Sequence, residues 1–167
     1  MNELNVFHKD TYGSWKYPKN WLKNIEQFFY NTKCAWQRAT KGYCNRDVWS
    51  LDTYLLNLLH FTIRDLAFHH YGYPCTEPFD TDEDWTKFLL DVSWKFYRAN
   101  EEHDVYPHPM YDKWCEDIHK HPEEWLDYQS PYSHEMFVEM QELDEKRKAV
   151  FEDAWRQLGE YFFWMWD

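Results

Sequence analysis

Large apolar side chains recur at helical spacing along most of this chain, and this repeat limits the fold more than any other feature of the sequence. In residues 20–42 the apolar positions are Trp21, Ile25, Phe28, Phe29 and Trp36. A period near 3.6 residues predicts an amphipathic helix there, capped by Asn20 and ended by Gly42. No segment shows the two-residue alternation of a half-buried strand, so the sequence predicts an all-α fold.

The same spacing predicts three more long helices. One covers Asp47–His70 and has apolar residues on almost all sides, so we expect it to be central and the most buried. Another begins with Thr81 as its N-cap and carries an apolar face of Trp85, Phe88, Leu89, Val92 and Phe96. The last begins at Ser130–Pro131 and runs nearly to the end of the chain, with Gly159 as a candidate break.

Composition sets the expected size and packing of the fold. The chain has 167 residues, a usual length for one compact domain, and 22% of them are aromatic. Only 4 are Gly, which disfavours a loop-rich all-β protein. We predict a single compact helical bundle of four or five helices over residues 1–167, with an aromatic-rich core. Prolines leave room only for short helices in an irregular insert at about 101–131 that is rich in His, Pro and Trp.

The formal net charge of −12, from 30 acidic and 18 basic residues, limits the partners of the chain. Nucleic acid and anionic membrane surfaces both reward Lys and Arg, so we predict no direct nucleic-acid binding and no membrane binding. An acidic chain suits a basic partner, and it equally suits plain solubility.

The segment YFFWMWD at the C-terminus is the densest apolar feature, yet it is too short to span a bilayer. We predict that the last helix folds these rings into the core and leaves only Asp167 at the surface. An exposed run would instead form a patch for a partner or a membrane interface. A base-stacking platform is a third alternative, but accompanying basic residues are missing.

Four cysteines occur, Cys34, Cys44, Cys75 and Cys115, and none forms a Cys-x-x-Cys pair. The first residues, MNELNVFHKDTYGSW, have neither the basic start nor the apolar run of a secretory leader. We therefore expect reduced thiols and a cytoplasmic location.

Asp52 lies in the second predicted helix among apolar residues: Val48, Leu51, Leu55, Leu58 and Leu59. An isolated buried carboxylate would cost several kcal/mol, so we expect it to have a partner. Arg38 or Arg46 can supply one, and Tyr54 and His60 are further candidates. A catalytic acid needs a second group in the same cleft, and the sequence identifies none, so no catalytic residue is predicted. We interpret four residues as a structural polar core: Arg46, Asp47, Asp52 and His60.

Nine histidines raise the question of a metal site. Cys115 and His119 share one helical face, and His69, His70 and Cys75 cluster near the end of the second predicted helix. Zinc needs about four ligands at suitable geometry, and neither cluster has a known ligand spacing. We predict no metal ligand and no cofactor. The chain also lacks a Gly-x-Ser-x-Gly elbow and a Gly-rich phosphate loop, which favours a non-enzymatic role.

The last predicted helix carries an acidic row along one side, formed by Glu135, Glu139, Glu142 and Glu145. Its spacings of four, three and three residues place successive carboxylates roughly 5–6 Å apart. Such a row can imitate DNA phosphates toward a basic protein groove, so these four are the predicted partner-binding residues. A solvated helix face explains the same pattern, and basic residues at 146–148 interrupt the row directly afterwards.

Several motifs together resemble a family of uncharacterised proteins encoded by tailed phages and prophages. They are WQRATKGYCNRDVWSLDTYL, HHYGYP followed by DEDW, and a terminal WMWD. The resemblance covers roughly Trp36 to Phe96 and the final helix, and its core motif runs from Arg46 to Leu55. It implies a phage origin and expression in the infected bacterial cytoplasm. It implies no reaction, cofactor or catalytic residue.

We therefore predict a non-enzymatic phage accessory protein that binds a host protein through an acidic surface. The partner would be basic or nucleic-acid-binding, for example a nucleic-acid-handling or defence enzyme such as a CRISPR effector. Three alternatives remain open at this point. They are a small-ligand or nucleotide-sequestering module, a metal-dependent hydrolase, and a virion component.

Overall fold

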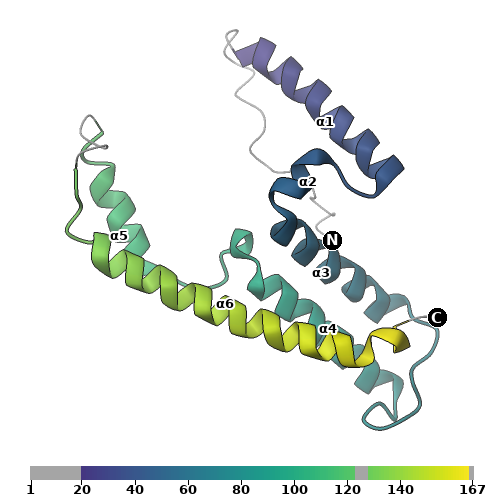
Figure 1. The fold of residues 1–167 in the computed structure, drawn as a ribbon. Coiled ribbons are helices and arrows are strands. Elements are labelled where there is room, and N and C mark those ends of the chain that lie inside the picture. The colour runs from purple at the N-terminus through teal and green to yellow at the C-terminus, as the bar shows by residue number, and fades with distance from the viewer. Residues whose placement is uncertain (1–19, 123–127, 166–167) are drawn as a thin grey trace. The chain divides into compact units, whose positions relative to one another are not determined.

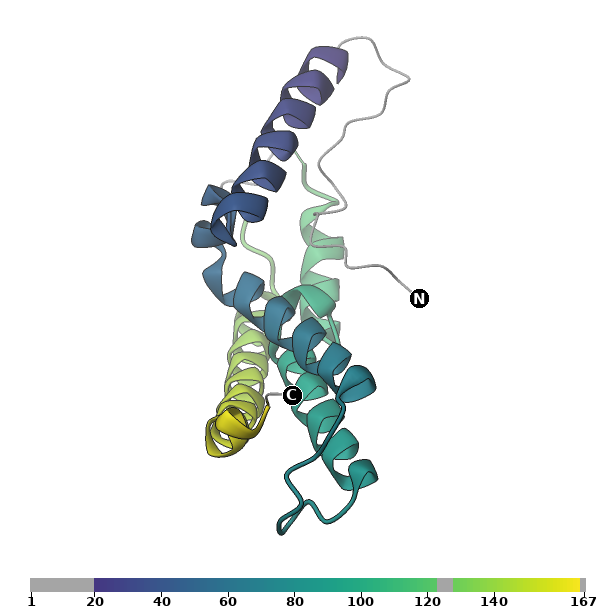
Figure 2. The same ribbon diagram turned by 90° about the vertical axis from the view of Figure 1, so that its right-hand side faces the viewer.

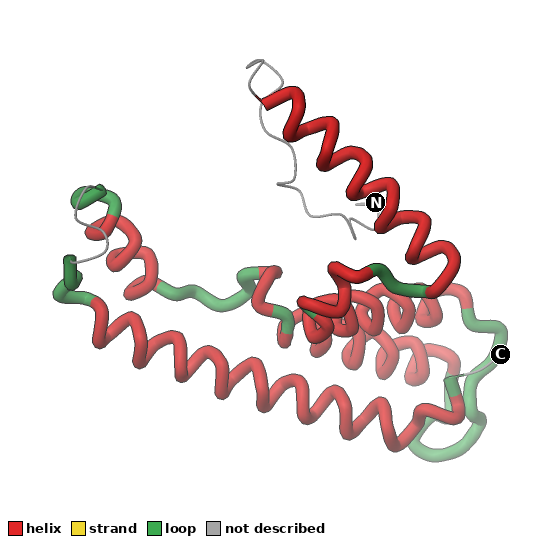
Figure 3. Tube along the Cα trace, turned by 45° about the horizontal axis from the view of Figure 1, so that its top comes forward, coloured by secondary structure: helices red, strands yellow, loops and turns green. Residues whose placement is uncertain are grey.

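The computed structural model describes residues 20–122 and 128–165, which form helices joined by turns and loops (Figures 1 and 3). Its α-helices are α1 (Trp21–Lys41), α2 (Asn45–Trp49), α3 (Leu51–His69), α4 (Asp82–Ala99), α5 (Pro109–Ile118) and α6 (Ser133–Tyr161). Two short 3-10 helices are η2 (Glu101–His103) and η3 (Phe162–Trp164). One isolated β-bridge, Thr76 to Phe79, is the only strand-like pairing within the described ranges. The all-α prediction is confirmed.

The chain divides into two compact units, one ending at Asn57 and the other beginning at Leu58. The boundary falls inside α3, so its first residues belong to the first unit. We describe each unit by itself, and the single domain over residues 1–167 stays a prediction. No described helix combines the length and the apolar character needed to cross a bilayer.

In the first unit, α1 has the predicted ends. Asn20 is its N-cap, and Gly42 follows in the left-handed region at φ 82°, with its N–H donating to the Arg38 carbonyl over 2.9 Å. Glycine suits this position because it carries no Cβ. The predicted Asp47–His70 helix, however, is divided at Ser50, whose φ of −122° and ψ of 55° lie outside the helical range.

The second unit is organised around α4, which buries more large side chains than any other described helix. Trp85, Leu89, Val92 and Phe96 are fully enclosed, as is Ser93. The expectation that the Asp47–His70 segment is the most buried is therefore wrong, since several of its apolar residues are exposed. At the start of α4, the Thr81 hydroxyl accepts from the Asp84 amide over 3.2 Å, as an N-cap should.

Helix α6 packs along α4, and both views of the ribbon show the two helices side by side (Figures 1 and 2). An aromatic cluster closes one end of this pair. Phe79 lies 4.8 Å from Trp85 and 4.9 Å from Tyr161, measured between ring centroids, and Phe88 lies 5.1 Å from Tyr161. The aromatic-rich core is thus confirmed. Helix α6 starts at Ser133, slightly later than predicted, and continues through Gly159.

The C-terminal aromatic run only partly joins this core. Tyr161 does, but Phe162, Phe163 and Trp164 are exposed, although the Trp164 ring lies 5.5 Å from that of Tyr161. The prediction that the last helix buries all of these rings is wrong for these three. Successive residues of a helical segment point in different directions, so neighbours of Tyr161 cannot share its contacts. Asp167 lies outside the described residues.

The insert at about 101–131 contains short helices, as the sequence predicted. Between Glu101 and Pro131 the described residues form η2 and the ten-residue α5, which packs against α6. Its role as an added recognition element stays a prediction.

The core of α4 generates the first prediction. Phe96→Ala removes a fully buried ring and should lower the free energy of unfolding by about 3–5 kcal/mol. Phe163→Ala is the matched control, because that ring is 80% exposed, and it should change stability by less than about 0.5 kcal/mol. Urea unfolding followed by circular dichroism measures both values. Similar losses in the two variants would contradict the assigned core.

Candidate functional site

Asp47 is the buried carboxylate of the first unit. One of its oxygens, Oδ2, accepts from Arg38 Nε over 2.9 Å and from the Cys44 backbone amide over 2.7 Å. Its other oxygen, Oδ1, accepts from Arg38 Nη2. Asp47 is the third residue of α2, and together with the N-cap Cys44 it forms a capping box. The carboxylate thereby ties the end of α1 to the start of α2.

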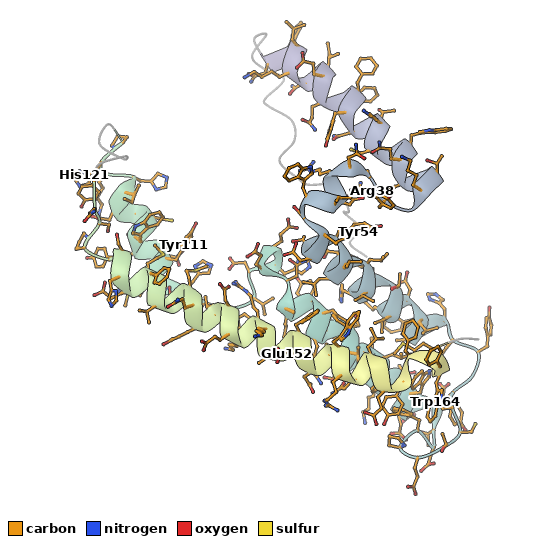
Figure 4. All side chains as sticks on the ribbon, in the orientation of Figure 1. Arg38, Tyr54, Tyr111, His121, Glu152 and Trp164 are labelled. Carbon is orange, nitrogen blue, oxygen red and sulfur yellow. The ribbon has the colours of Figure 1, made fainter. Side chains whose placement is uncertain are left out.

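The electrostatics of Asp47 follow from these contacts. Burial alone would raise its pKa, but the hydrogen bonds from Arg38 and Cys44 outweigh burial and hold the pKa below the ordinary value. The carboxylate is therefore ionised at neutral pH and serves as a structural brace. Arg38 projects from the last part of α1 (Figure 4). Nearby, the Tyr54 hydroxyl donates to the Gly42 carbonyl over 2.6 Å.

Asp52 has a different environment from the one predicted. It is exposed in the first turn of α3, so the prediction of a buried acid at this position is wrong. Arg38, one of the two arginines expected as its partner, binds Asp47 instead. Asp52 still shares α3 with the leucines, but Leu51, Leu55 and Leu58 are exposed as well, so the side of α3 that carries this acid is not buried. Arg46 is half-buried. Of the four predicted polar core residues, Asp47 and His60 are buried.

His60 belongs to the second unit and joins α3 to α4. Its Nδ1 lies 3.0 Å from the Ser93 carbonyl oxygen and 2.9 Å from Ser93 Oγ, while Ser93 Oγ donates to the His60 carbonyl over 2.9 Å. A carbonyl can only accept, so Nδ1 carries a proton. Burial lowers the pKa of His60, although its bond to the Ser93 carbonyl opposes that shift. The neutral ring lies among Trp94 and Tyr97, and Tyr97 stacks on His103.

A serine beside a histidine, such as Ser93 beside His60, can act as a catalytic nucleophile if its hydroxyl can reach a substrate. The Ser93 hydroxyl is fully buried between two helices, and its proton is directed at a backbone carbonyl. A working nucleophile must reach its substrate, and its base needs a third group for orientation. The pair instead satisfies buried polar groups at a helix crossing, which is a structural role.

The two suspected metal clusters are not assembled. His119 Nδ1 bonds the Cys115 carbonyl over 2.6 Å, so this pair forms a local helix-end contact. Both nitrogens of His70 are engaged, one with the Gly72 carbonyl and one with Thr86 Oγ1, each over 2.9 Å. Within the ranges that the structure covers, no group of three or more His, Cys, Asp or Glu side chains could hold an ion.

The predicted acidic row is divided by the fold. Glu139 Oε2 accepts from the backbone amides of Met110 and Tyr111, each over 2.9 Å, and so caps the N-terminus of α5. Figure 4 labels Tyr111 at this contact between α5 and α6. Glu135, Glu142 and Glu145 are exposed along α6 and form the remaining acidic surface. We refer to these three residues as the α6 acidic face.

Charge is distributed unequally between the two units. The sequence from 58 to 167 carries 25 acidic and ten basic residues, whereas residues 1–57 carry five acidic and eight basic residues. Several carboxylates of the second unit are neutralised locally, such as Asp91 and Asp153, which both bind Lys95. Glu152, labelled in Figure 4, lies 3.8 Å from Lys148. The second unit as a whole is therefore strongly negative.

Sequence reasoning missed one further surface. The apolar face of α1 that predicted its helix is exposed, while the residues that α1 buries are Asn24 and Cys34. Cys34 lies opposite the apolar face and Asn24 lies beside it, and their burial could not be read from the periodicity. Periodicity identifies an apolar face but does not say whether anything covers it.

Comparisons with family models, with curated proteins and with solved structures each find no match to this chain. The resemblance to a phage-encoded family therefore stays a prediction.

The brace at Asp47 generates the second prediction. Asp47→Asn should lower the free energy of unfolding at pH 7 by about 1.5–3 kcal/mol, because Arg38 loses a charged acceptor. The folded-state pKa of Asp47 lies below the unfolded value of about 3.9. Its stabilisation is therefore present above the unfolded value and is lost as the pH falls through the folded pKa. The stability of wild type should therefore approach that of Asp47→Asn as the pH falls. Urea unfolding of both proteins, in steps from pH 7 to about pH 3, measures this difference.

Asp52→Asn is the control for the same experiment. Asp52 is exposed, so its substitution should change stability by less than about 0.5 kcal/mol at pH 7. If both variants lose the same stability, Asp47 is not the brace that its contacts indicate.

Proposed function

We propose that this chain is a non-enzymatic phage accessory protein that binds a host protein in the cytoplasm of the infected bacterium. The partner is a basic or nucleic-acid-binding protein. A nucleic-acid-handling or defence enzyme, such as a CRISPR effector, would have the basic surface that this proposal needs. The phage origin is supported by the sequence resemblance alone. Binding is supported by the physical features of the second unit.

The charge of the second unit carries the proposal. An excess of 15 acidic residues over basic ones between 58 and 167 produces a negative potential that attracts a basic surface. The Debye length at physiological salt is about 8 Å, so neighbouring carboxylates on one helix act together on an approaching partner. The α6 acidic face supplies three such carboxylates, and Glu139 is committed to capping α5.

The organisation of the polar groups also favours binding over catalysis. The buried titratable residues Asp47 and His60 are each satisfied by partners within their own unit. The exposed carboxylates of α6 lie on a long rigid helix, which can present them in fixed register to a groove. Electrostatic complementarity of this kind speeds association and selects among partners.

The third prediction tests the α6 acidic face directly. A variant with Glu135→Lys, Glu142→Lys and Glu145→Lys should lose capture of a basic host protein from bacterial lysate, identified by mass spectrometry. Wild-type binding should weaken at least about tenfold between about 0.05 and 0.5 M salt, because exposed charge pairs are screened.

A second triple variant provides the control: Asp65→Lys, Glu101→Lys and Glu116→Lys. These residues are exposed on other elements, and the substitutions change the net charge by the same amount. The control should retain the partner. Equal loss in both variants would indicate a response to net charge rather than to this face. Salt-independent binding, or no basic partner at all, would contradict the proposal.

A further inference from the structure

His108 lies between two carboxylates at the start of α5. Its Nε2 is 2.6 Å from Asp104 Oδ1, and its Nδ1 is 3.3 Å from Asp112 Oδ1. The His108 side chain is 21% exposed, whereas each aspartate side chain is 65% exposed. Both ring nitrogens therefore face a negative oxygen from a largely enclosed position.

This geometry requires a charged ring. A neutral imidazole has one N–H, so it can donate to one carboxylate only, and its other nitrogen turns a lone pair toward the second carboxylate. Nδ1 of His108 is also the one buried side-chain nitrogen or oxygen without a hydrogen bond among the residues that the structure describes. A charged Nδ1–H is attracted by Asp112, which compensates its burial, and a neutral ring loses this compensation.

The three residues belong to successive parts of the insert. Asp104 follows η2 in the left-handed region at φ 48°. His108 is the N-cap of α5, and Asp112 lies in the first turn of that helix. A protonated His108 therefore ties the end of η2 to the start of α5.

Other titratable and charged groups near His108 come from α5 and α6. The Tyr111 ring lies 5.4 Å from the His108 ring, measured between centroids. From α6, Glu139 accepts from the first free amides of α5, and Lys146 lies 4.3 Å from the centre of the Tyr106 ring. The charges that act most strongly on His108 are nevertheless those of its two aspartates.

The direction of the pH dependence follows from these contacts. The hydrogen bond with Asp104 raises the pKa of His108 above its ordinary value, against the opposing effect of burial, and the charges of both aspartates add to the rise. In an opened segment the ring has its ordinary pKa of about 6.5. The stabilisation is therefore complete below about pH 6.5 and is lost as the pH rises through the pKa of the closed form.

We infer that His108 is a proton-operated clamp, which holds the end of η2 against the first turn of α5 while it is protonated and lets this segment open when the proton leaves. Helix α5 keeps its cap from Glu139 on α6, so the opening is confined to the loop and the first turn. The clamp makes the conformation of the insert depend on pH. It is independent of the partner proposed for the α6 acidic face.

Nuclear magnetic resonance of the histidine rings in the full chain tests the charge state. His108, assigned by comparison with His108→Gln, should titrate above the ordinary value of about 6.5. Asp104→Asn should lower the pKa of His108, because Asp104 is the nearer carboxylate, and asparagine tolerates the left-handed backbone at this position. Asp144→Asn is the control, because Asp144 is an exposed carboxylate of α6 that pairs with Arg147, and it should leave the pKa of His108 unchanged.

Hydrogen exchange measured by mass spectrometry tests the opening. In wild type, the protection of residues 104–113, corrected for the intrinsic exchange rate, should fall about threefold to tenfold between about pH 6 and pH 8.5. This is the effect of two partly exposed ion pairs. His108→Gln should remove the pH dependence. His119→Gln is the control at the other end of α5 and should retain it, because the His119 ring faces a backbone carbonyl and not a carboxylate.

Three results would overturn the clamp. The first is a wild-type His108 that titrates at or below about pH 6.5, which would mean that the aspartates do not hold its proton. The second is equal protection of residues 104–113 at both pH values, which would leave an ion pair without a conformational effect. The third is a pH dependence that persists in His108→Gln, which would assign the opening to another group.

Discussion

The packing of α6 and α3 against α4 determines which side chains of the second unit are buried and which are exposed. Four large side chains of α4 are fully enclosed, and each contributes roughly 1.5–3 kcal/mol through burial. Because α4 covers one side of α6, Tyr161 enters the aromatic cluster, while Phe162 and Phe163 point elsewhere and stay exposed. The side chains of α6 that meet α4 lie in its C-terminal half and include Phe151, Trp155 and Tyr161. Glu135, Glu142 and Glu145 lie in the other half, which contacts α5 through Glu139, and they are exposed there.

Local signals in the sequence predicted the parts of the fold that depend on local chemistry. Gly42 ends α1 because a left-handed residue is needed there, and Thr81 starts α4 because its hydroxyl accepts a free amide. The division at Ser50 was not predictable in this way. Helical periodicity assumes an unbroken phase, and a single residue outside the helical range rotates everything after it. The break separates Val48 from Asp52, but Asp52 is exposed because its neighbours on α3, such as Leu55 and Leu58, are exposed as well. Asp47 is the buried acid because Arg38 and the Cys44 amide enclose it.

The roles of individual carboxylates depend on contacts between distant residues. Spacing alone correctly indicated that Glu135, Glu139, Glu142 and Glu145 belong to one helix. It could not indicate that Glu139 meets the first amides of α5, almost 30 positions earlier in the chain. Likewise, the sequence offered Arg38 and Arg46 equally as partners for a buried acid, and only the turn at Gly42 brings Arg38 to Asp47. His60 was correctly predicted as a buried polar residue, but its partner Ser93 was not.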